Sequence, residues 1–280
     1  YRTLKGLFNK TQLYSIFILI IFHSFRSIRF FLISVEFEKN SKYRDSFIIY
    51  YISLALTVIT PGGIGQLSRI KLLSDKGFTN LNIYNVLMIE KITDVLAILS
   101  ILFFFIISSI YNINLYLILT LSALLFSVII FFGYSIVKVI SAFISKKTIE
   151  TKQSSLKFIN TLITSLLSMP KGNLIITYLY TTALWFLFIY VLWIGLNSVV
   201  NINFLESSGV FVINSIAVAI PITFSGYGLR EIILEYTMYD NNSYNTIAVI
   251  TLQYTIIYLI SFLIGSLILI WTKYKLWMKK

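Results

Sequence analysis

Long apolar runs separated by short polar connectors dominate the pattern of this chain. Five runs reach or exceed the roughly 20 residues that a helix needs to cross a bilayer. They cover residues 13–35, 82–110, 115–140, 173–196 and 243–272. The pattern therefore predicts an all-α, polytopic membrane protein in which each of these runs is a candidate membrane span.

Two further apolar stretches, 46–60 and 208–224, are interrupted by proline and glycine. Thr-Pro-Gly-Gly-Ile-Gly at 60–65 ends the first stretch, and Pro-Ile-Thr-Phe-Ser-Gly-Tyr-Gly at 221–228 ends the second. Proline removes a backbone donor and clashes with the preceding turn, and glycine permits non-helical backbone. We therefore expect helix breaks at Pro61 and Pro221.

A short amphipathic segment follows each break, at 66–77 and at 229–239. Each segment is too short to cross a bilayer alone. We predict two re-entrant hairpins, 46–77 and 208–239, each of which enters and leaves the membrane on the same side. Irregular backbone at this depth is tolerated only where it packs in protein or lines a wet cavity.

The basic residues predict the orientation of these elements. Lys and Arg gather in the connectors 36–45, 66–81 and 138–172 and in the C-terminal tail, whereas connectors 111–114, 197–207 and 240–245 contain none. By the positive-inside rule the first group is cytoplasmic. The first hairpin then enters from the cytoplasm, the second enters from outside, and the C-terminus is cytoplasmic. Arg2, Lys5 and Lys10, which precede the first helix, conflict with this orientation.

The order of elements predicts an inverted repeat within a single membrane domain, 1–280. Residues 13–110 form a first repeat of helix, hairpin and helix, and 173–272 form a second. A linking helix and a basic cytoplasmic connector occupy 115–172, and the odd helix turns the second repeat upside down. The residues that correspond roughly are Pro61, Gly63, Gly65 and Arg69 with Pro221, Gly226, Gly228 and Arg230. Inverted repeats with broken helices are a recurring plan of secondary transporters.

Composition narrows the function classes. The 280 residues are 58% hydrophobic and 12% charged, which excludes a soluble domain. The net charge of +12 indicates loops facing anionic lipid rather than a nucleic-acid groove. With no cysteine and only one histidine, His23, we expect no metal site and no cofactor. We interpret His23 as a hydrogen-bonded packing residue, with a proton shuttle as the less favoured alternative.

The glycine-rich breaks have the chemistry of an anion site. A glycine-rich turn leading into a helix presents free N–H groups and the positive end of the helix dipole. Arg69 and Arg230 lie about one turn into the two helices and could each add a bidentate contact to phosphate. The candidate phosphate-binding glycines are Gly62, Gly63, Gly65, Gly226 and Gly228. The alternative is that these glycines only let the hairpins pack and that Arg69 reaches the membrane surface.

Further charges lie inside apolar segments, where burial is costly and function is the default expectation. Arg26 and Arg29, spaced i, i+3, either reach the membrane interface or contact a phosphate on the cytoplasmic side. Glu231 neighbours the second break and is a candidate for pairing with Arg230 or for gating, and Glu235 repeats its carboxylate one turn later.

Glu90 and Asp94 form a second i, i+4 carboxylate pair, with Lys91 beside them. They lie well inside helix 82–110 and therefore need partners, for which we consider Arg69 or Arg26. The group is either a structural charge network or a gating and coupling site in which one carboxyl carries a proton.

Taken together, these motifs resemble one known family. The motifs are Arg26-x-x-Arg29-Phe30, the run 60–69, Glu90-Lys91-x-x-Asp94 and the run 221–231. They resemble the lysylphosphatidylglycerol synthase transmembrane-region family, the flippase-like domain of MprF-type and AglD-type membrane proteins, here as a stand-alone member. The resemblance spans about residues 13–272. The family commonly has Glu and Arg where this chain has Gln66 and Lys91, which leaves open any coupling role of the first position.

The resemblance implies movement of an anionic phospholipid or polyprenyl-phosphate-type lipid between leaflets. We therefore predict a multi-pass lipid translocase of the cytoplasmic membrane rather than an enzyme, with the lipid phosphate bound between the two glycine-rich hairpin tips. The alternatives are an intramembrane enzyme or accessory subunit that acts on a lipid phosphate through Glu90, Asp94 or Glu231, and a membrane scaffold. The expected partners are membrane lipids and no nucleic acid, with a homo-oligomer or a separate synthase left open.

Overall fold

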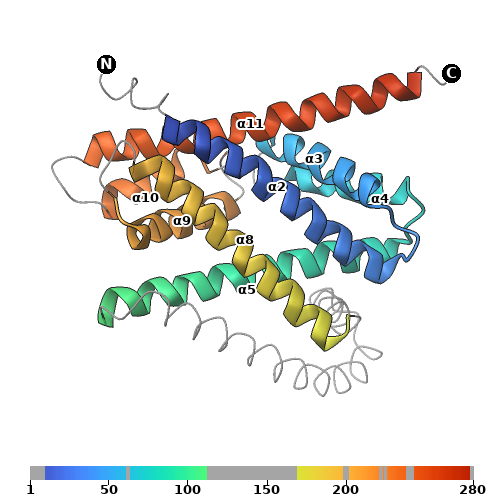
Figure 1. Cartoon of the computed structure of the whole chain (residues 1–280), viewed down its shortest axis with the longest axis horizontal. Coiled ribbons are helices and arrows are strands. Elements are labelled where there is room, and N and C mark those ends of the chain that lie inside the picture. The colour runs from blue at the N-terminus through green and yellow to red at the C-terminus, as the bar shows by residue number, and fades with distance from the viewer. Residues whose placement is uncertain are drawn as a thin grey trace, which may run out of the picture. The chain divides into compact units, whose positions relative to one another are not determined.

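The computed structural model describes residues 10–60, 64–111, 169–197, 202–220, 223, 226–237 and 243–277. These residues are helical apart from turns and short connections, and none of them lies in a strand (Figure 1). The all-α prediction is therefore confirmed for the part of the chain that is described. The predicted helix 115–140 and the connector as far as residue 168 lie outside it.

The helices follow the hydropathy pattern closely. In chain order they are α2 (Lys10–Phe37), α3 (Tyr43–Ile59), the 3₁₀ turn η1 (Ile64–Leu67), α4 (Ser68–Ser74), α5 (Asn80–Tyr111), α8 (Lys171–Asn197), α9 (Phe204–Ala219), α10 (Leu229–Thr237) and α11 (Ser243–Trp277). Among the described residues, four helical stretches are long and apolar enough to cross a membrane: Tyr14–Phe37, Asn80–Ser108, Gly172–Asn197 and Ile247–Thr272. The chain is a multi-pass membrane protein.

Both predicted helix breaks are present. Helix α3 ends at Ile59 and leaves Thr60 extended at φ −115°, ψ 143°. Helix α9 ends at Ala219 and leaves Ile220 extended at φ −81°, ψ 115°. A residue that precedes proline is driven out of the helical region by the proline ring. The prolines that follow, Pro61 and Pro221, lie outside the described residues.

The chain reverses direction after the first break. The amide of Gly65 donates to Thr60 Oγ1 over 2.7 Å, which closes the turn that leads into η1. At the other end of the hairpin, Lys76, just past the end of α4, forms a 2.6 Å ion pair with Asp45 in the first turn of α3. Segment 64–76 therefore runs back along α3.

The second break also produces a hairpin. Helix α9 begins with a capping box in which Asn203 and Glu206 satisfy each other's backbone N–H groups. Between α9 and α10 the chain passes through Gly226 and Gly228. Their φ angles of 83° and 85° lie in the left-handed region that favours glycine. Helix α10 then packs on α9. The re-entrant paths of the two hairpins and their inverted relation stay predictions.

Packing divides the described residues into two compact units. The first comprises those within 1–28, 42–76 and 184–280, and the second those within 29–41 and 77–183. Helices α2 and α8 each contribute residues to both units. The first unit contains both hairpins, so this division differs from the two predicted repeats.

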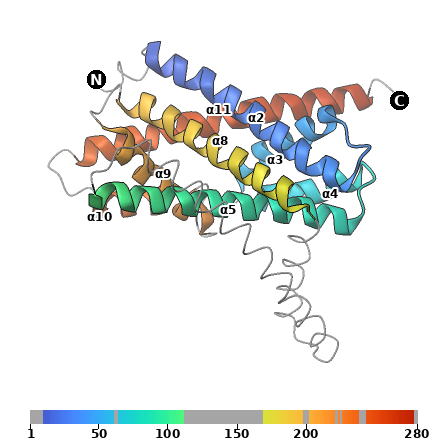
Figure 2. The same ribbon diagram turned by 60° about the horizontal axis from the view of Figure 1, so that its bottom comes forward.

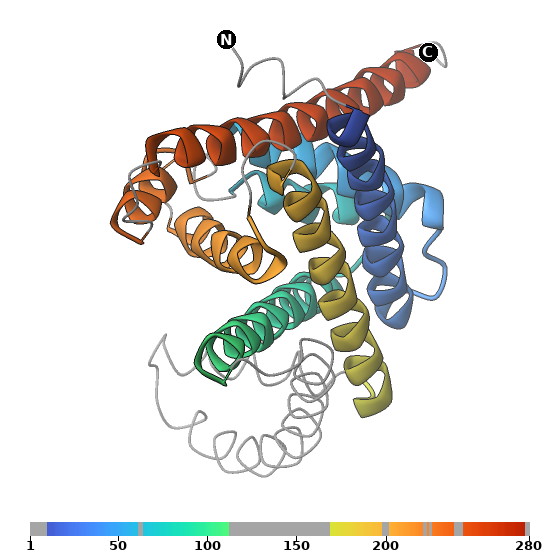
Figure 3. The same cartoon turned by 60° about the vertical axis from the view of Figure 1, so that its left-hand side comes forward.

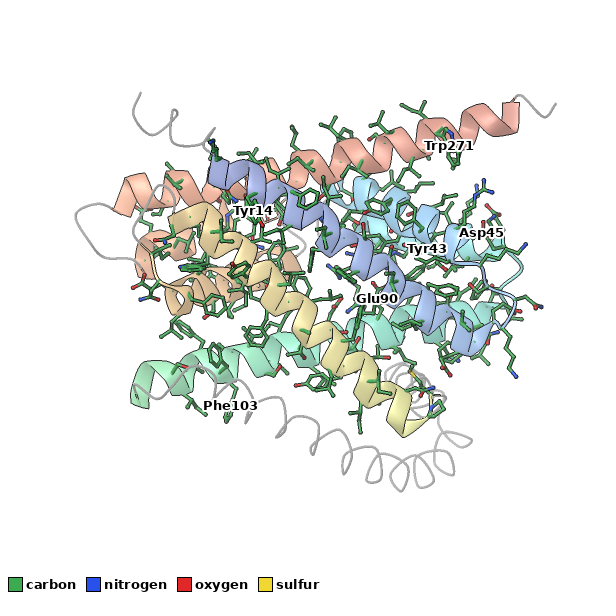
Figure 4. All side chains as sticks on the ribbon, in the orientation of Figure 1. Tyr14, Tyr43, Asp45, Glu90, Phe103 and Trp271 are labelled. Atoms are coloured by element: carbon green, nitrogen blue, oxygen red, sulfur yellow. The ribbon has the colours of Figure 1, made fainter. Side chains whose placement is uncertain are left out.

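Helix α11 is the element of the first unit on which both hairpins pack. Figures 1, 2 and 3 show its C-terminal half alongside α3, and in Figures 1 and 3 its N-terminal end lies near α10. Thr251 contacts the second hairpin, and Gly265 packs so closely on α3 that an added Cβ would lie 2.3 Å from the Tyr51 carbonyl oxygen. These positions are about 21 Å apart along the helix at 1.5 Å per residue. Figure 4 shows Asp45 and Trp271 toward the same end of this unit.

Candidate functional site

A buried charge cluster occupies the second unit, where α2, α5 and α8 contribute side chains. Arg29, 1% exposed, donates from Nη1 to Asp94 Oδ1 over 2.7 Å and from Nη2 to Glu90 Oε1 over 3.1 Å. Its Nη1 also reaches Thr181 Oγ1 at 2.9 Å. The i, i+4 spacing thus places both carboxylates on one guanidinium, as a shared helix face predicts.

The partner of the two carboxylates in this unit is an arginine that the spacing did not single out. We considered Arg69 or Arg26 for this role, and those pairings stay predictions. Glu90 is buried and labelled in Figure 4, whereas its neighbour Lys91 is exposed. Since a guanidinium and two carboxylates carry a net negative charge when ionised, the cluster is compatible either with a structural role or with a site that holds an additional proton.

Arg26 has a different environment from Arg29, although the two lie less than one turn apart. It is half-buried, and its Cζ lies 4.7 Å from the ring centroid of Trp185 and 5.8 Å from that of Phe22. An arginine over aromatic faces gains cation–π attraction. Arg26 therefore stacks in the aromatic core of the first unit, while Arg29 binds carboxylates in the second.

Arg69 is held inside the first hairpin. It lies in α4, is 3% exposed and donates from Nε to Ser53 Oγ of α3 over 2.7 Å. Its Cζ lies 5.3 Å from the ring centroid of Tyr50. The arginine is therefore packed against α3, and this contact helps to bind the return segment to the preceding helix.

Arg230 is held in the same way inside the second hairpin. It is 0% exposed and donates from Nη1 to Asn214 Oδ1 of α9 over 3.2 Å. Its Cζ lies near two tyrosine rings, 4.9 Å from the centroid of Tyr227 and 4.7 Å from that of Tyr254. Burial of a whole guanidinium is costly unless its donors are satisfied, and the hydrogen bond to Asn214 and the two ring contacts offset part of that cost.

The two hairpins share a spacing that sequence reasoning missed. Arg69 bonds to Ser53 and Arg230 bonds to Asn214, and in both cases the partner stands 16 positions earlier. Each arginine is the second residue of its helix. Ser53 and Asn214 are polar residues inside apolar half-helices, which is the signal that could have identified them.

Glu231 completes the group around Arg230. Its Oε1 accepts from Arg230 Nε at 3.0 Å, from Arg230 Nη2 and from Thr251 Oγ1 at 2.8 Å, and its Oε2 accepts from the amide of Gly228 at 2.7 Å. The predicted pairing of Glu231 with Arg230 is confirmed. Its gating role stays a prediction.

The glycines of the two breaks have different structural roles. An added Cβ on Gly65 would lie 2.2 Å from the backbone carbon of Leu56, so this glycine lets η1 rest directly on α3. Gly226 and Gly228 instead supply the left-handed turn before α10. Gly62 and Gly63 lie outside the described residues. Phosphate binding by these five glycines stays a prediction.

A groove borders the second hairpin on the side of α11. It encloses about 510 Å³ and is lined by Glu231, Ile232, Glu235, Ile247, Ala248, Thr251, Leu252 and Thr255. The walls combine apolar side chains with two carboxylates and two threonine hydroxyls. This groove is therefore an amphipathic surface that leads to the partner of the buried Arg230.

His23 joins three helices of the first unit. Its Nδ1 lies 3.0 Å from Tyr50 Oη of α3, and its Nε2 lies 3.0 Å from Ser261 Oγ of α11. Ser261 uses its hydroxyl proton on the Ile257 carbonyl, so Nε2 is the donor and Nδ1 accepts from Tyr50. His23 is therefore buried and hydrogen-bonded at both ring nitrogens, as expected of a packing residue, and its role as packing residue rather than proton shuttle stays a prediction.

Replacing Tyr50 with phenylalanine is expected to destabilise this junction. The change keeps the ring beside Arg69 but leaves the buried Nδ1 of His23 without its donor, at a cost of about 1–3 kcal/mol. The Tyr51→Phe variant is the matched control, because the Tyr51 hydroxyl makes only a long 3.4 Å contact with Ser24. Unfolding in detergent, followed by circular dichroism, should give a clearly lower free energy of unfolding for Tyr50→Phe than for Tyr51→Phe. Equal stabilities would contradict the assignment of Tyr50 as hydrogen-bond donor to His23 Nδ1.

The apolar helices and buried charge clusters define a multi-pass helical membrane protein. The chain belongs to the lysylphosphatidylglycerol synthase TM region family, whose model matches residues 6–268. Membership indicates a function connected with membrane lipids or the cell envelope. Neither a curated protein nor a solved structure matches the chain.

Proposed function

We propose that the protein is a lipid translocase that moves an anionic phospholipid or a polyprenyl-phosphate-type lipid between leaflets. The lipid phosphate binds at the two hairpins, where Arg69 and Arg230 supply the positive charge, while the lipid tails stay in the bilayer. Movement of one repeat against the other exposes the site alternately to the two sides, as in other inverted-repeat transporters.

The observation that carries this proposal is the pair of buried hairpin arginines. Each follows a glycine-containing break and is anchored to the preceding helix through a partner 16 positions earlier. A buried charge inside an apolar membrane segment is expensive and marks a functional site by default. Arginine also suits phosphate because its guanidinium can form bidentate bonds. Arg26 and Arg29 remain predicted as further phosphate contacts, and Glu90, Lys91 and Asp94 as gating or coupling charges.

Arg69→Ala and Arg230→Ala are each expected to reduce lipid translocation at least about tenfold, the scale of one lost charge-assisted contact of 1.5–3 kcal/mol. The measurement uses proteoliposomes with a fluorescent phosphatidylglycerol, and dithionite bleaching reports the lipid in the outer leaflet. Arg44→Ala is the control, because Arg44 is exposed, its Cζ lies 5.8 Å from the ring centroid of Trp271, and it takes no part in the hydrogen bonds from Arg69 to Ser53 or from Arg230 to Asn214. Parent-like translocation by both hairpin variants would refute the proposal.

The same proteoliposomes distinguish a translocase from an enzyme that acts on lipid phosphate. A translocase leaves its substrate chemically unchanged, whereas an enzyme converts it. Mass spectrometry of the extracted lipid after the assay is therefore expected to recover intact fluorescent phosphatidylglycerol only. Protein-dependent conversion of the lipid would favour the enzymatic alternative.

A further inference from the structure

The carboxylate of Glu231 occupies the donors that a phosphate at the second hairpin would need. It accepts from Arg230 Nε and Nη2, from Thr251 Oγ1 and from the Gly228 amide. Guanidinium, hydroxyl and backbone N–H groups are the donors that proteins direct at phosphate oxygens. A phosphate bound here would therefore compete with Glu231 for the same atoms.

Arg230 is held in place by its surroundings. An incoming anion must therefore reach the buried guanidinium, because the side chain cannot easily turn outward to meet the anion. The guanidinium is 0% exposed, contacts the rings of Tyr227 and Tyr254, and bonds to Asn214. A buried side chain that is packed against two rings and hydrogen-bonded at its end has little freedom to turn outward. Access to this charge depends on what covers it.

Glu231 is the more exposed member of the pair. Its side chain is 25% exposed, whereas that of Arg230 is 0% exposed. It also lines the 510 Å³ groove between α10 and α11, whose volume falls within the range of about 300–1,000 Å³ that is typical of small-ligand sites. Rotation of the Glu231 side chain into this groove would uncover the guanidinium, the hydroxyl and the amide together.

We propose that Glu231 is a resident anion that a phosphate oxyanion displaces. Before a phosphate arrives, the carboxylate neutralises Arg230 and accepts hydrogen bonds from Arg230, Thr251 and the Gly228 amide. An arriving phosphate takes over Arg230, Thr251 and the Gly228 amide, and the carboxylate returns when the phosphate leaves. This inference rests on the proposed function in taking phosphate as the ligand chemistry, and it assigns the regulation of that site to one side chain.

Competition of this kind lowers the apparent affinity for phosphate, because only the fraction of protein with Glu231 displaced can bind. Removing the carboxylate removes that penalty, so Glu231→Gln is expected to bind phosphatidylglycerol about tenfold more tightly than the parent chain. Native mass spectrometry of the full chain in detergent, titrated with phosphatidylglycerol against phosphatidylcholine, measures the change. Glu231→Ala, which introduces no new polar group, is the second variant and should show the same gain.

Glu235→Gln is the matched control for the lost charge. Glu235 lies one turn further along the same helix, is exposed and lines the same groove. Among the described residues, the hydrogen bonds from the Arg230 side chain go to Asn214 and Glu231 and not to Glu235. The affinity for phosphatidylglycerol should therefore stay within about twofold of the parent, as is usual for surface substitutions that change free energy by less than about 0.5 kcal/mol. Adding Arg230→Gln to Glu231→Gln should abolish the gain.

Inorganic phosphate distinguishes the two sources of the oxyanion. If the Glu231 variants gain affinity for both inorganic phosphate and phosphatidylglycerol, or for the lipid alone, the displacing group is a lipid headgroup. If they gain affinity for inorganic phosphate alone, the displacing group is free phosphate. Unchanged binding of both probes by folded Glu231→Gln and Glu231→Ala would overturn the inference. That result would not affect the proposal that the hairpin arginines are needed for lipid translocation. Conversely, if the variants bind phosphate more tightly but the parent protein translocates no lipid, only the proposed transport function is refuted.

Discussion

Replacing Arg29 with methionine is expected to lower the free energy of unfolding by about 3–5 kcal/mol, the cost of removing one partner from a buried ion pair. The guanidinium bonds to Asp94 at 2.7 Å and to Glu90 at 3.1 Å. Methionine retains much of the side-chain volume, so the loss reports the charge rather than a cavity. The two buried carboxylates would remain without this cation. Unfolding of the purified chain in detergent, followed by circular dichroism, measures the change.

Two further variants identify the charge as the cause. Lys91→Met removes a neighbouring positive charge that is exposed, and an exposed substitution of this kind should change stability by less than about 0.5 kcal/mol. Combining Arg29→Met with Glu90→Gln and Asp94→Asn removes the two negative charges that Arg29 neutralises and should recover part of the loss in stability. Parent-like stability of Arg29→Met alone would show that the cluster does not depend on its arginine.

The same cluster shows what can be predicted from the sequence and what cannot. The i, i+4 spacing of Glu90 and Asp94 predicts a shared face because helical periodicity is local. The choice of Arg29 as their partner depends on which helices are neighbours, and a partner 65 positions away leaves no local signal. The carboxylate pair was therefore predicted, whereas its guanidinium partner was not.

The hairpins also combine a feature that the sequence predicts with one that it does not. Their breaks were predictable because proline excludes the helical conformation at the preceding residue, as the extended Thr60 and Ile220 confirm. The anchoring of Arg69 on Ser53 and of Arg230 on Asn214 depends instead on the angle at which each return segment packs. The arginines were thus identified as candidates, whereas their partner residues Ser53 and Asn214 emerged only from the structure.

Replacing Gly65 with alanine is expected to disrupt the first hairpin more than any exposed substitution. The new Cβ would lie 2.2 Å from the Leu56 carbon and 2.3 Å from the Thr57 nitrogen. These are backbone atoms, so no rotamer change can relieve the overlap and the turn must move away from α3. Overpacking of this kind costs about 1–3 kcal/mol and occasionally more. Unfolding in detergent should show this loss.

Gly172→Ala provides the matched control, because a Cβ at Gly172 meets no atom within 4 Å. Alanine is favoured over glycine inside a helix by up to about 1 kcal/mol, so this variant should be as stable as the parent or slightly more stable. Displacement of η1 by Gly65→Ala also moves Arg69, four residues later, away from its 2.7 Å contact with Ser53. Lipid translocation should therefore fall in Gly65→Ala and persist in Gly172→Ala. Equal stability and translocation in the two variants would show that close packing of Gly65 on α3 is not what holds the arginine in place.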